Sequence, residues 1–583
     1  MRPERRFWRM IFRSLAAWTT LLFPAVVFAQ DSTVSKPPAA DSGATVDVQA
    51  PTTVRTVREA PHHVMVGSDD ENYLRYLQDA GLAPLYPWSI REFSQKELAE
   101  LAVKQGSHPW SGKGDYRDYP SKYSFKILPV NVAFRFNSAF PWGSNDGAIW
   151  AGRGLTSSLD LGFAFRAGPL SATFNPIAFR AENTSFHLQP NGISGNPYAD
   201  PIYAADVDRP QQFGSGAYSR LDPGESTVRL DLIGLTAGVS TANMGWGPME
   251  LYPYIIGANA PGFLHAFAGT SAPLPIWIGK IHGRVYWGKL EQSAFSPVTG
   301  TSYYSSELEP GTKRFMSGAV ATFQPRGISG LEIGAARFFH SAWPREGIPR
   351  SYFTKPFQAL LKNSLGNPGG FVAGTDQGIS DNQLASAFFR WVLPSSSFET
   401  YGEYGREDHS ADLRDFVQEP DHSRTYGLGF RKVFGSDSSS VSALRFEMIN
   451  YELPTLARHR GEGGVYVHTL LRQGHTNLGQ PLGSDAGLGS GGGSTIAWDR
   501  YSSRGMTTIS FSRIIREQVG TFYLGGPSNP NANDVAIVVS AERSRFLSVG
   551  EFVASLNMVR ELNWQLTKDA WNINPTLGAR LRF

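Results

Sequence analysis

The sequence predicts an all-β fold, a transmembrane antiparallel β-barrel of about 18 strands with a small N-terminal helical periplasmic segment. Three observations predict this fold: an export signal at the start, apolar residues at every second position from about residue 125, and a last strand that ends in Phe583. After the N-terminus, no run has the roughly 18 uninterrupted apolar residues of a membrane-spanning helix. Barrel strands alternate instead, so their hydrophobic residues do not form such runs.

The first residues have the three parts of a secretory signal, which we assign to residues 1–29. Five arginines within the first thirteen residues form a positive region, residues 15–28 form an apolar region, and Ala29 precedes a small-residue cleavage site. A retained membrane anchor is the alternative, disfavoured because the apolar region is short and interrupted by Pro24. The chain contains no cysteine, which suits an oxidising compartment. We therefore expect export, with a mature chain that begins at Gln30.

Two segments are expected to precede the barrel. Residues 30–66 are rich in Pro, Ser, Thr, Ala and Val without periodicity, which predicts a flexible periplasmic tether. Residues 67–120 are predicted to form a small helical periplasmic segment. A capping box, in which serine is followed three residues later by glutamate, occurs there at Ser68–Glu71 and again at Ser94–Glu97. The apolar stripe on each helix is narrow, so we expect both helices to dock on another part of the protein.

Residues 121–583 are predicted to form the barrel with its long loops, because the hydrophobic period changes to two. The clearest strand runs from Trp277 to Trp287. One face carries Trp277, Gly279, Ile281, Gly283, Val285 and Trp287, and the other carries Lys280, His282, Arg284 and Tyr286. Ten steps of ~3.3 Å at a tilt near 45° give a height of roughly 24 Å, the apolar band of an outer membrane. A charged face can line a wet lumen but not a dry sandwich core.

Alternation of this kind predicts seventeen strands. They lie near residues 125–136, 157–167, 169–181, 226–233, 235–242, 276–290, 316–324, 330–340, 384–393, 398–406, 424–434, 440–451, 463–472, 504–516, 535–543, 548–560 and 574–583. A barrel with both ends in the periplasm needs an even number. When the short turns at 167–169 and 394–397 are placed at the periplasmic end, the strands counted from the two ends of the chain disagree in direction between residues 243 and 314. We therefore predict one further strand there, and eighteen in all.

The last strand carries Leu577, Ala579, Leu581 and Phe583 on one face. A C-terminal strand of alternating apolar residues that ends in phenylalanine resembles the signal read by the barrel-assembly machinery. Phe583 is therefore the predicted assembly-signal residue, and the machinery and the outer-membrane lipid are predicted partners.

Enzyme, cofactor and nucleic-acid signatures are weak. The net charge is +3 with no basic run beyond the first residues, which gives no support for nucleic-acid binding. There is no G-x-S-x-G motif and no P-loop, and the G-x-G-x-x-G match at Gly487, Gly489 and Gly492 lies in a glycine-rich run predicted to be a flexible loop. The histidines form no ligand cluster. We therefore predict a protein that is not an enzyme, without cofactor or metal.

Two acidic features of the sequence are candidate sites. The stretch Arg406–Asp415 could bind a cation, but it lacks an EF-hand spacing, and a solvated loop is favoured. Glu399 and Glu403 share one strand face, as a glycosidase carboxylate pair could. Lumen charges paired with arginine are the commoner arrangement, and we prefer that interpretation.

Several scattered motifs resemble the Wzi-type capsule assembly proteins of the outer membrane. They are the turn Trp246-Gly247-Pro248 followed by Asn259-Ala260, the run Arg472-Gln473-Gly474-His475 that leads to Gly-Gln-Pro-Leu-Gly, the helix at 69–80 followed by Pro87-Trp88, and Tyr401-Gly402-Glu403-Tyr404-Gly405. The resemblance covers about residues 69–583. It implies an eighteen-stranded barrel in the bacterial outer membrane that acts as a lectin, tying capsular polysaccharide or exopolysaccharide to the cell surface. The long tether and a looser phrase at 258–263 depart from the family pattern.

The candidate glycan-binding residues come from these motifs. Sugars offer hydroxyl groups to polar side chains and flat C–H faces to aromatic rings. The candidates are Trp246, Tyr252, Tyr254, Asn259, Arg472, Gln473 and His475. The alternative for each is a packing role in a girdle or loop. The alternative function is a sugar-selective or general porin, which would share the barrel but conduct ions.

Overall fold

The computed structural model describes residues 64–581. Its gaps are 95–96, 99–100, 102–107, 111–122, 205, 296–312, 345–346, 358–380, 408–416, 418–422, 436–438, 454–463, 469–470 and 518–532. All described residues belong to one compact unit, Thr56–Phe583. The predicted signal at 1–29, nearly all of the predicted tether and Phe583 lie outside the described residues.

The helix predicted first is α2 (Asp69–Asp79). Its Ser68 hydroxyl accepts a hydrogen bond from the Glu71 amide at 3.3 Å, which satisfies one of the free donors of the first turn. The second capping box forms in both directions, since the Glu97 amide donates to Ser94 Oγ at 3.1 Å and the Ser94 amide donates to Glu97 Oε2 at 2.7 Å. Two shorter helices, α4 (Arg350–Thr354) and η2 (Lys355–Phe357), follow β14, and η4 (Pro394–Ser396) forms a turn.

Among the described residues, no helix is both long and apolar enough to cross a bilayer.

The rest of the described chain is mainly antiparallel strand. The strands are β1 (Tyr123–Ile127), β2 (Val130–Asn137), β3 (Gly154–Asp160), β4 (Phe163–Ala167), β5 (Leu170–Phe174), β6 (Ile177–Ala181), β7 (Tyr218–Asp222), β8 (Thr227–Leu232), β9 (Leu235–Ser240), β10 (His265–Thr270), β11 (Leu274–Ile276), β12 (Gly279–Glu291), β13 (Lys313–Pro325), β14 (Leu331–Ala342), β15 (Asp381–Leu393), β16 (Phe398–Glu407), β17 (Arg424–Phe434), β18 (Ser440–Asn450), β19 (Thr476–Asn477), β20 (Gln480–Pro481), β21 (Gly492–Ser502), β22 (Gly505–Glu517), β23 (Asp534–Leu547), β24 (Gly550–Trp564) and β25 (Lys568–Leu581).

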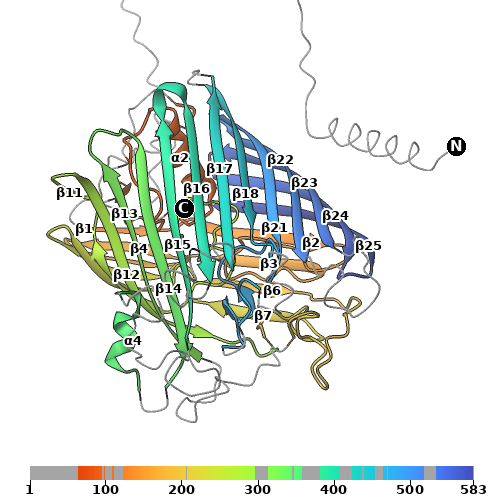
Figure 1. Cartoon of the computed structure of the whole chain (residues 1–583). Coiled ribbons are helices and arrows are strands. Elements are labelled where there is room, and N and C mark those ends of the chain that lie inside the picture. Colours follow the sequence, from red (N-terminus) through yellow and green to blue (C-terminus); the bar gives the residue numbers. More distant parts are fainter. Residues whose placement is uncertain are drawn as a thin grey trace, which may run out of the picture. The chain divides into compact units, whose positions relative to one another are not determined.

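The large sheet closes on itself. Within the described residues it holds 23 strands, and β19 and β20 form a separate hairpin. We call each crossing of the barrel wall by the chain a pass. β25 pairs with β2, with Leu581 opposite Val130, so the last pass pairs with the first and closes the sheet (Figure 1). The strands β1–β2, β3–β4, β5–β6, β7–β8 and β10–β11 each continue one pass across a short break, because both members pair with the same neighbouring pass. Joining these five pairs leaves eighteen passes.

The requirement for an even number of strands correctly predicted a strand that the hydrophobic pattern had not shown. The predicted extra strand between residues 243 and 314 is β10 with β11, which pairs with β9 on one side and β12 on the other. Another prediction was wrong. In the predicted strand 463–472, the described residues are not extended strand, and only an isolated bridge joins Val465 to Gly489. The pass at that place is β21, which pairs with β18 and β22.

A glycine run concealed β21. The sequence assigned Gly487–Gly492 to a flexible loop, but Gly492 and Gly493 open the strand. A Cβ atom on Gly493 would lie 2.6 Å from the Tyr252 ring, so the missing side chain lets a lumen residue pack on the wall. The glycines therefore hide only the start of the strand, because farther along it Ala497 and Asp499 are buried while Ile496 and Trp498 face outward.

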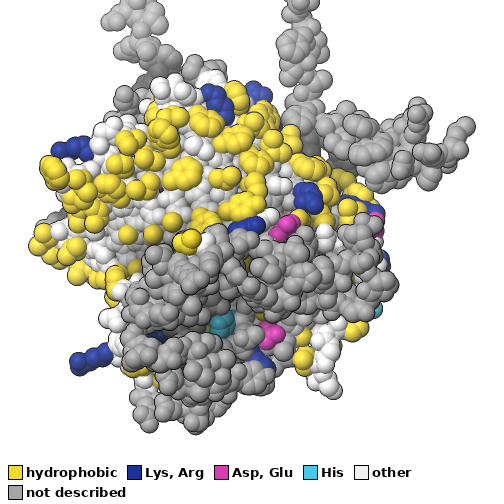
Figure 2. All heavy atoms as spheres, in the orientation of Figure 1, with side chains coloured by type: hydrophobic (Ala, Val, Ile, Leu, Met, Phe, Trp, Pro, Cys, Tyr) yellow, Lys and Arg dark blue, Asp and Glu magenta, His cyan; other side chains and the backbone are white. Residues whose placement is uncertain are grey.

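The inward and outward faces follow the predicted alternation. On β12, His282, Arg284 and Tyr286 are buried, whereas Ile281 on the opposite face is 41% exposed. Large hydrophobic side chains are exposed along the strands, and Figure 2 shows them gathered across the barrel wall on the visible face. This belt is what a lipid-facing surface requires.

Candidate functional site

The lumen holds a plug made from both ends of the barrel. The N-terminal part (64–94) meets the β9–β10 loop (241–264), because Ile90 bridges Trp246 and the Arg91 amide donates to the Gly245 carbonyl at 3.0 Å. The described part of the β18–β21 loop, chiefly 471–491, packs on the same β9–β10 loop, and the Gly257 amide donates to the Leu482 carbonyl at 3.0 Å. Short turns such as η4 lie at the α2 end, which is the periplasmic end of such a barrel, and the long loops lie at the other end (Figure 1).

Three of the predicted glycan-binding residues lie together in the core of this plug. The Trp246 ring packs against Tyr286 and Phe338, with ring centroids 5.1 and 5.9 Å apart. His475 packs edge-on to the same Phe338 at 4.9 Å, and its Nε2 donates to the Ile255 carbonyl at 2.6 Å. Tyr254 stacks on Tyr466, which in turn stacks on His475. The two segments that carry the family resemblance therefore meet in space.

The other predicted residues hold loops together. The Tyr252 hydroxyl is 2.6 Å from Thr495 Oγ1 on the wall. Asn259 accepts from the Asn145 amide at 3.2 Å and donates to the Pro481 carbonyl at 3.1 Å, so its amide group joins three loops.

Gln473 donates to Gln292 Oε1 at 3.1 Å, and Arg472 is half-buried.

Burial changes the interpretation of these residues. Trp246 and His475 are 0% exposed and Tyr254 is 1% exposed. A sugar cannot stack on a ring face that neighbouring side chains already cover, so in this structure these rings have the packing role that was weighed as the alternative. Whether any of the seven residues contacts a glycan remains a prediction.

Buried charges join the plug to the wall. Arg75 of α2 donates from Nε to Glu399 Oε1 at 2.7 Å, and Arg390 donates to Glu399 Oε2 at 2.6 Å. Glu399 therefore has the predicted role of a lumen charge paired with arginine. Glu250 of the β9–β10 loop lies 2.6 Å from Arg431 and 3.0 Å from Arg75. Burial alone would raise the pKa of Glu250, but the nearby arginines lower it to about 2.

Other wall carboxylates accept hydrogen bonds from the plug backbone. Glu447 accepts from the amides of Glu250, Leu251 and Tyr252 at 2.7–2.8 Å, and Glu332 accepts from Trp88 and Ser89 at 2.8 and 3.1 Å. Such charge-assisted bonds are the strong ones. Of the acidic stretch Arg406–Asp415, for which a solvated loop was favoured over a cation site, only Arg406 and Glu407 are described, and Glu407 accepts from Asn382 and the Tyr466 amide.

A second candidate site is a cavity that is lined by aromatic rings and lies outside the core of the plug. At the long-loop end, a space of about 210 Å³ is lined by Phe140, Trp142, Trp150, Phe186 and Trp564 together with polar side chains of five loops. We call it the extracellular cavity. Phe140 stacks on Trp564 at 4.9 Å, and the Arg516 guanidinium lies 4.5 Å from the centre of the Trp142 ring. Asn259 is the one predicted residue among its lining side chains.

Ion pairs and amides hold the polar side of this cavity. Arg516 pairs with Glu561 at 3.0 Å, and Arg209 pairs with Asp200 at 2.7 Å. Gln565 donates to Gln211 at 3.0 Å. Burial raises the pKa of Asp485, although Arg516 and Arg209 lower it.

None of these rings is among the residues predicted from the sequence. The available signal was two tryptophans, Trp142 and Trp150, around a Gly- and Asn-containing turn between two predicted strands. Aromatic residues in a long loop of a barrel with exposed loops form a surface that can bind ligands.

Comparisons with known proteins show the same fold. No protein-family model and no curated protein matches the chain. Among solved structures, the chain is similar to Wzi of Escherichia coli, described as an outer-membrane protein involved in group 1 capsule assembly and as a carbohydrate-binding β-barrel. The identity is 14%, the match covers 89% of this chain and 99% of that chain, and the TM-score is 0.54. At this identity the likeness shows the fold alone: the protein has the β-barrel fold of outer-membrane proteins.

Two outer-membrane proteins match less well. OccAB3 of Acinetobacter baumannii is 9% identical over 78% of this chain and 98% of its own, with a TM-score of 0.36. OprD of Pseudomonas aeruginosa is 9% identical over 79% and 93%, with a TM-score of 0.34. These scores carry no argument about function.

The buried histidine of the plug predicts acid sensitivity. Burial lowers the pKa of His475 to about 3, while its bond to Ile255 opposes the shift and Arg314 adds to it. A histidine whose pKa is lower in the folded state stabilises the fold fully above its unfolded pKa of about 6.5, and this contribution is lost as the pH falls toward 3. Between pH 6.5 and pH 4 the protein should lose about 3 kcal/mol from this group.

The measurement is the unfolding midpoint in denaturant, followed by heat-modifiability on gels, at pH 7 and pH 4. His475→Gln keeps a donor for Ile255 and removes the titration, so its loss between the two pH values should be smaller by about the amount stated. Glu250 contributes in the same direction only below its unfolded pKa of 4.5. If the wild type and His475→Gln lost the same free energy of unfolding between pH 7 and pH 4, the acid sensitivity would not come from His475.

Proposed function

We propose that this protein is an outer-membrane barrel that binds capsular polysaccharide or exopolysaccharide and holds it at the cell surface. The observation that carries the proposal is the extracellular cavity, in which aromatic rings alternate with carboxylates, guanidinium groups and amides. This is the combination that sugar binding requires, because C–H faces stack on rings while hydroxyl groups take hydrogen bonds. The barrel fold, the exposed apolar belt and the earlier family resemblance support the same role.

The function is binding rather than catalysis in this proposal. Most of the carboxylates around the cavity are paired with arginine, as Glu561 is with Arg516 and Asp200 is with Arg209, and so resemble a recognition surface. A long polymer bridges many barrels, so weak single contacts add up to strong attachment. Asn259 is proposed to position the loops of the cavity through its bonds to Asn145 and Pro481.

The rival function is a sugar-selective or general porin. The plug of 64–94, 241–264 and 471–491 fills much of the lumen, which argues against a wide open pore. Conductance in a planar bilayer separates the two functions, because a general porin gives large steps in the wild type.

Loss of the cavity rings should release polysaccharide from the cell. In a strain deleted for this protein, polysaccharide should be made and exported but appear in the medium. Trp142→Ala or Trp150→Ala should weaken binding of polysaccharide purified from the same strain roughly tenfold, the effect of about 1.4 kcal/mol of lost stacking. The readouts are the cell-bound to free polysaccharide ratio and binding to the purified barrel.

Trp277→Ala is the matched control, since Trp277 is 86% exposed in the turn between β11 and β12 at the other end of the barrel. It should bind polysaccharide as the wild type does. Loss of synthesis in the deletion strain, or unchanged binding by folded Trp142→Ala and Trp150→Ala barrels, would refute the proposal.

A further inference from the structure

Three cavities follow one side of the barrel and share lining residues. The largest, which we call the lumen cavity, has about 600 Å³ between the plug and the inner faces of β21–β25 and β2. It shares Trp142, Ser144 and Asp146 with the extracellular cavity. At the other end it shares Asp69 and Thr508 with a third cavity of about 190 Å³, which Tyr501 and Met506 also line. The shared residues place the cavities in a row from the long loops to the α2 end.

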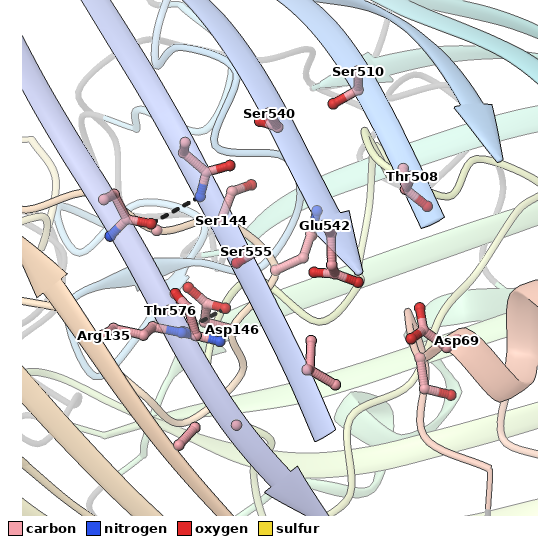
Figure 3. Close-up of a pocket in the computed structure, with 18 of the residues that line it drawn as sticks. Asp69, Arg135, Ser144, Asp146, Thr508, Ser510, Ser540, Glu542, Ser555 and Thr576 are labelled. Carbon is pink, nitrogen blue, oxygen red and sulfur yellow. Dashed lines mark hydrogen bonds and ion pairs between the residues drawn. The ribbon is translucent and has the colours of Figure 1, made fainter. Parts of the chain in front are cut away.

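The wall of this row is hydrophilic. Figure 3 shows Thr508, Ser510, Ser540 and Ser555 on neighbouring strands with their hydroxyl groups toward the same space. Their strand neighbours Ile509 and Val539 face outward and are 49% and 45% exposed. The pleat therefore gives one polar inner face over several strands, which water can fill.

Carboxylates outnumber arginines along the row. The lining side chains of the three cavities include nine Asp or Glu and five Arg residues, with no Lys or His. Glu542, labelled in Figure 3, lies between Thr508 and Ser555 in the part that the lumen cavity shares with the third cavity. Acidic side chains that line a restricted aqueous space favour cations over anions.

One ion pair lies where the lumen and extracellular cavities meet. Arg135 of β2 is 2.7 Å from Asp146 of the β2–β3 loop, as the dashed line in Figure 3 shows. The loop can reach inward because Gly143 has no side chain; a Cβ there would lie 2.4 Å from the Asp146 carboxylate. The Asn145 side chain also donates to the Leu251 carbonyl of the plug at 3.0 Å.

We propose that the three cavities form a path for small hydrophilic cations beside the plug, held shut by the Arg135–Asp146 ion pair. The path is a function distinct from polysaccharide binding, because most of its wall, from Thr508 to Thr576, lies in the lumen; the two functions have only the extracellular cavity in common. Breaking the ion pair frees the β2–β3 loop from the wall and joins the two larger cavities.

The test is current through the full mature chain in planar bilayers. Asp146→Ala and the more conservative Asp146→Asn should raise the mean current severalfold over the wild type, with a reversal potential in a KCl gradient that shows cation selectivity. Asp569→Ala is the control, because Asp569 forms an ion pair of 2.6 Å with Arg560 at the same end of the barrel but lines none of the three cavities.

Thiol modification locates the current. The chain has no cysteine, so an introduced one reacts alone. In the Asp146→Ala background, a cationic methanethiosulfonate reagent should block current in Ser540→Cys, whose side chain faces the row, and not in Val539→Cys, which faces outward. Folding of each variant is checked by heat-modifiability.

Either of two results would overturn the proposal. The first is folded Asp146→Ala and Asp146→Asn barrels that carry no more current than the wild type. The second is an increased current that is anion-selective or unaffected by modification at Ser540→Cys. Polysaccharide binding by the same preparations is measured in parallel, so a loss of one function is distinguished from a loss of the other.

Discussion

Replacing Glu399 with alanine should lower the free energy of unfolding by about 3–5 kcal/mol, the usual cost of removing one partner from a buried ion pair. Glu399 is 0% exposed, and its two carboxylate oxygens accept from Arg75 of α2 and Arg390 of β15. Without the Glu399 carboxylate, the buried positive charges of Arg75 and Arg390 have fewer negative partners in the lumen. Arg75 keeps Glu250 at 3.0 Å, and Arg390 keeps Gln78 at 3.0 Å, which limits the loss.

The loss should appear first as undocking of α2. Trypsin should cleave at Arg75 in the variant under conditions in which the wild type resists, and the denaturant midpoint should fall. Glu399→Gln keeps the shape and one acceptor and should cost less. Asp569→Ala breaks a pair that is partly exposed and should cost under about 1 kcal/mol. A Glu399→Ala barrel that resists trypsin like the wild type would show that α2 does not depend on this carboxylate.

The barrel was predictable because strands that cross a membrane turn apolar residues toward the lipid at every second position. The same rule explains the incorrect strand at 463–472. Val465 and Val467 share a predicted strand face, but Tyr466 between them is also buried inside the plug, so both faces of the segment are covered and the alternating pattern does not mark a strand. In a barrel with a filled lumen, a loop residue can be as buried as a wall residue. The requirement for an even number of strands located β10 and β11, which the hydrophobic pattern had missed, because this requirement depends on closure of the whole ring and not on any one segment.

The site was predictable only in part. The motifs around Trp246 and His475 identified two segments that do meet, at distances that join both rings through Phe338. The sequence cannot distinguish an aromatic ring that is presented to solvent from one that another ring covers, because the covering residues come from distant strands. The rings of the extracellular cavity come from two loops and one strand end, and no local spacing relates Trp142 to Trp564.

Trp246→Ala should destabilise the plug by about 3–5 kcal/mol, the range for removing a buried large aromatic side chain. The indole lies at the centre of the plug core, and its far edge fits against Gly318 of β13, where a Cβ atom would lie 2.4 Å from Cη2. The variant should lose heat-modifiability at a lower temperature, and any loss of polysaccharide retention should follow from that. Full stability with lost retention would instead show that Trp246 contacts the glycan directly.

A double-mutant cycle tests the packing directly. Gly318→Ala places a methyl group against the indole and should destabilise by about 1–3 kcal/mol through overpacking. Trp246→Phe removes the part of the indole that lies against Gly318, so it should leave a small cavity there. Because the added methyl group occupies that cavity, the double variant should be more stable than the sum of the two single losses predicts. Additive losses would mean that Trp246 and Gly318 do not pack on each other, and that the tryptophan is held in the lumen by Tyr286 and Phe338 alone.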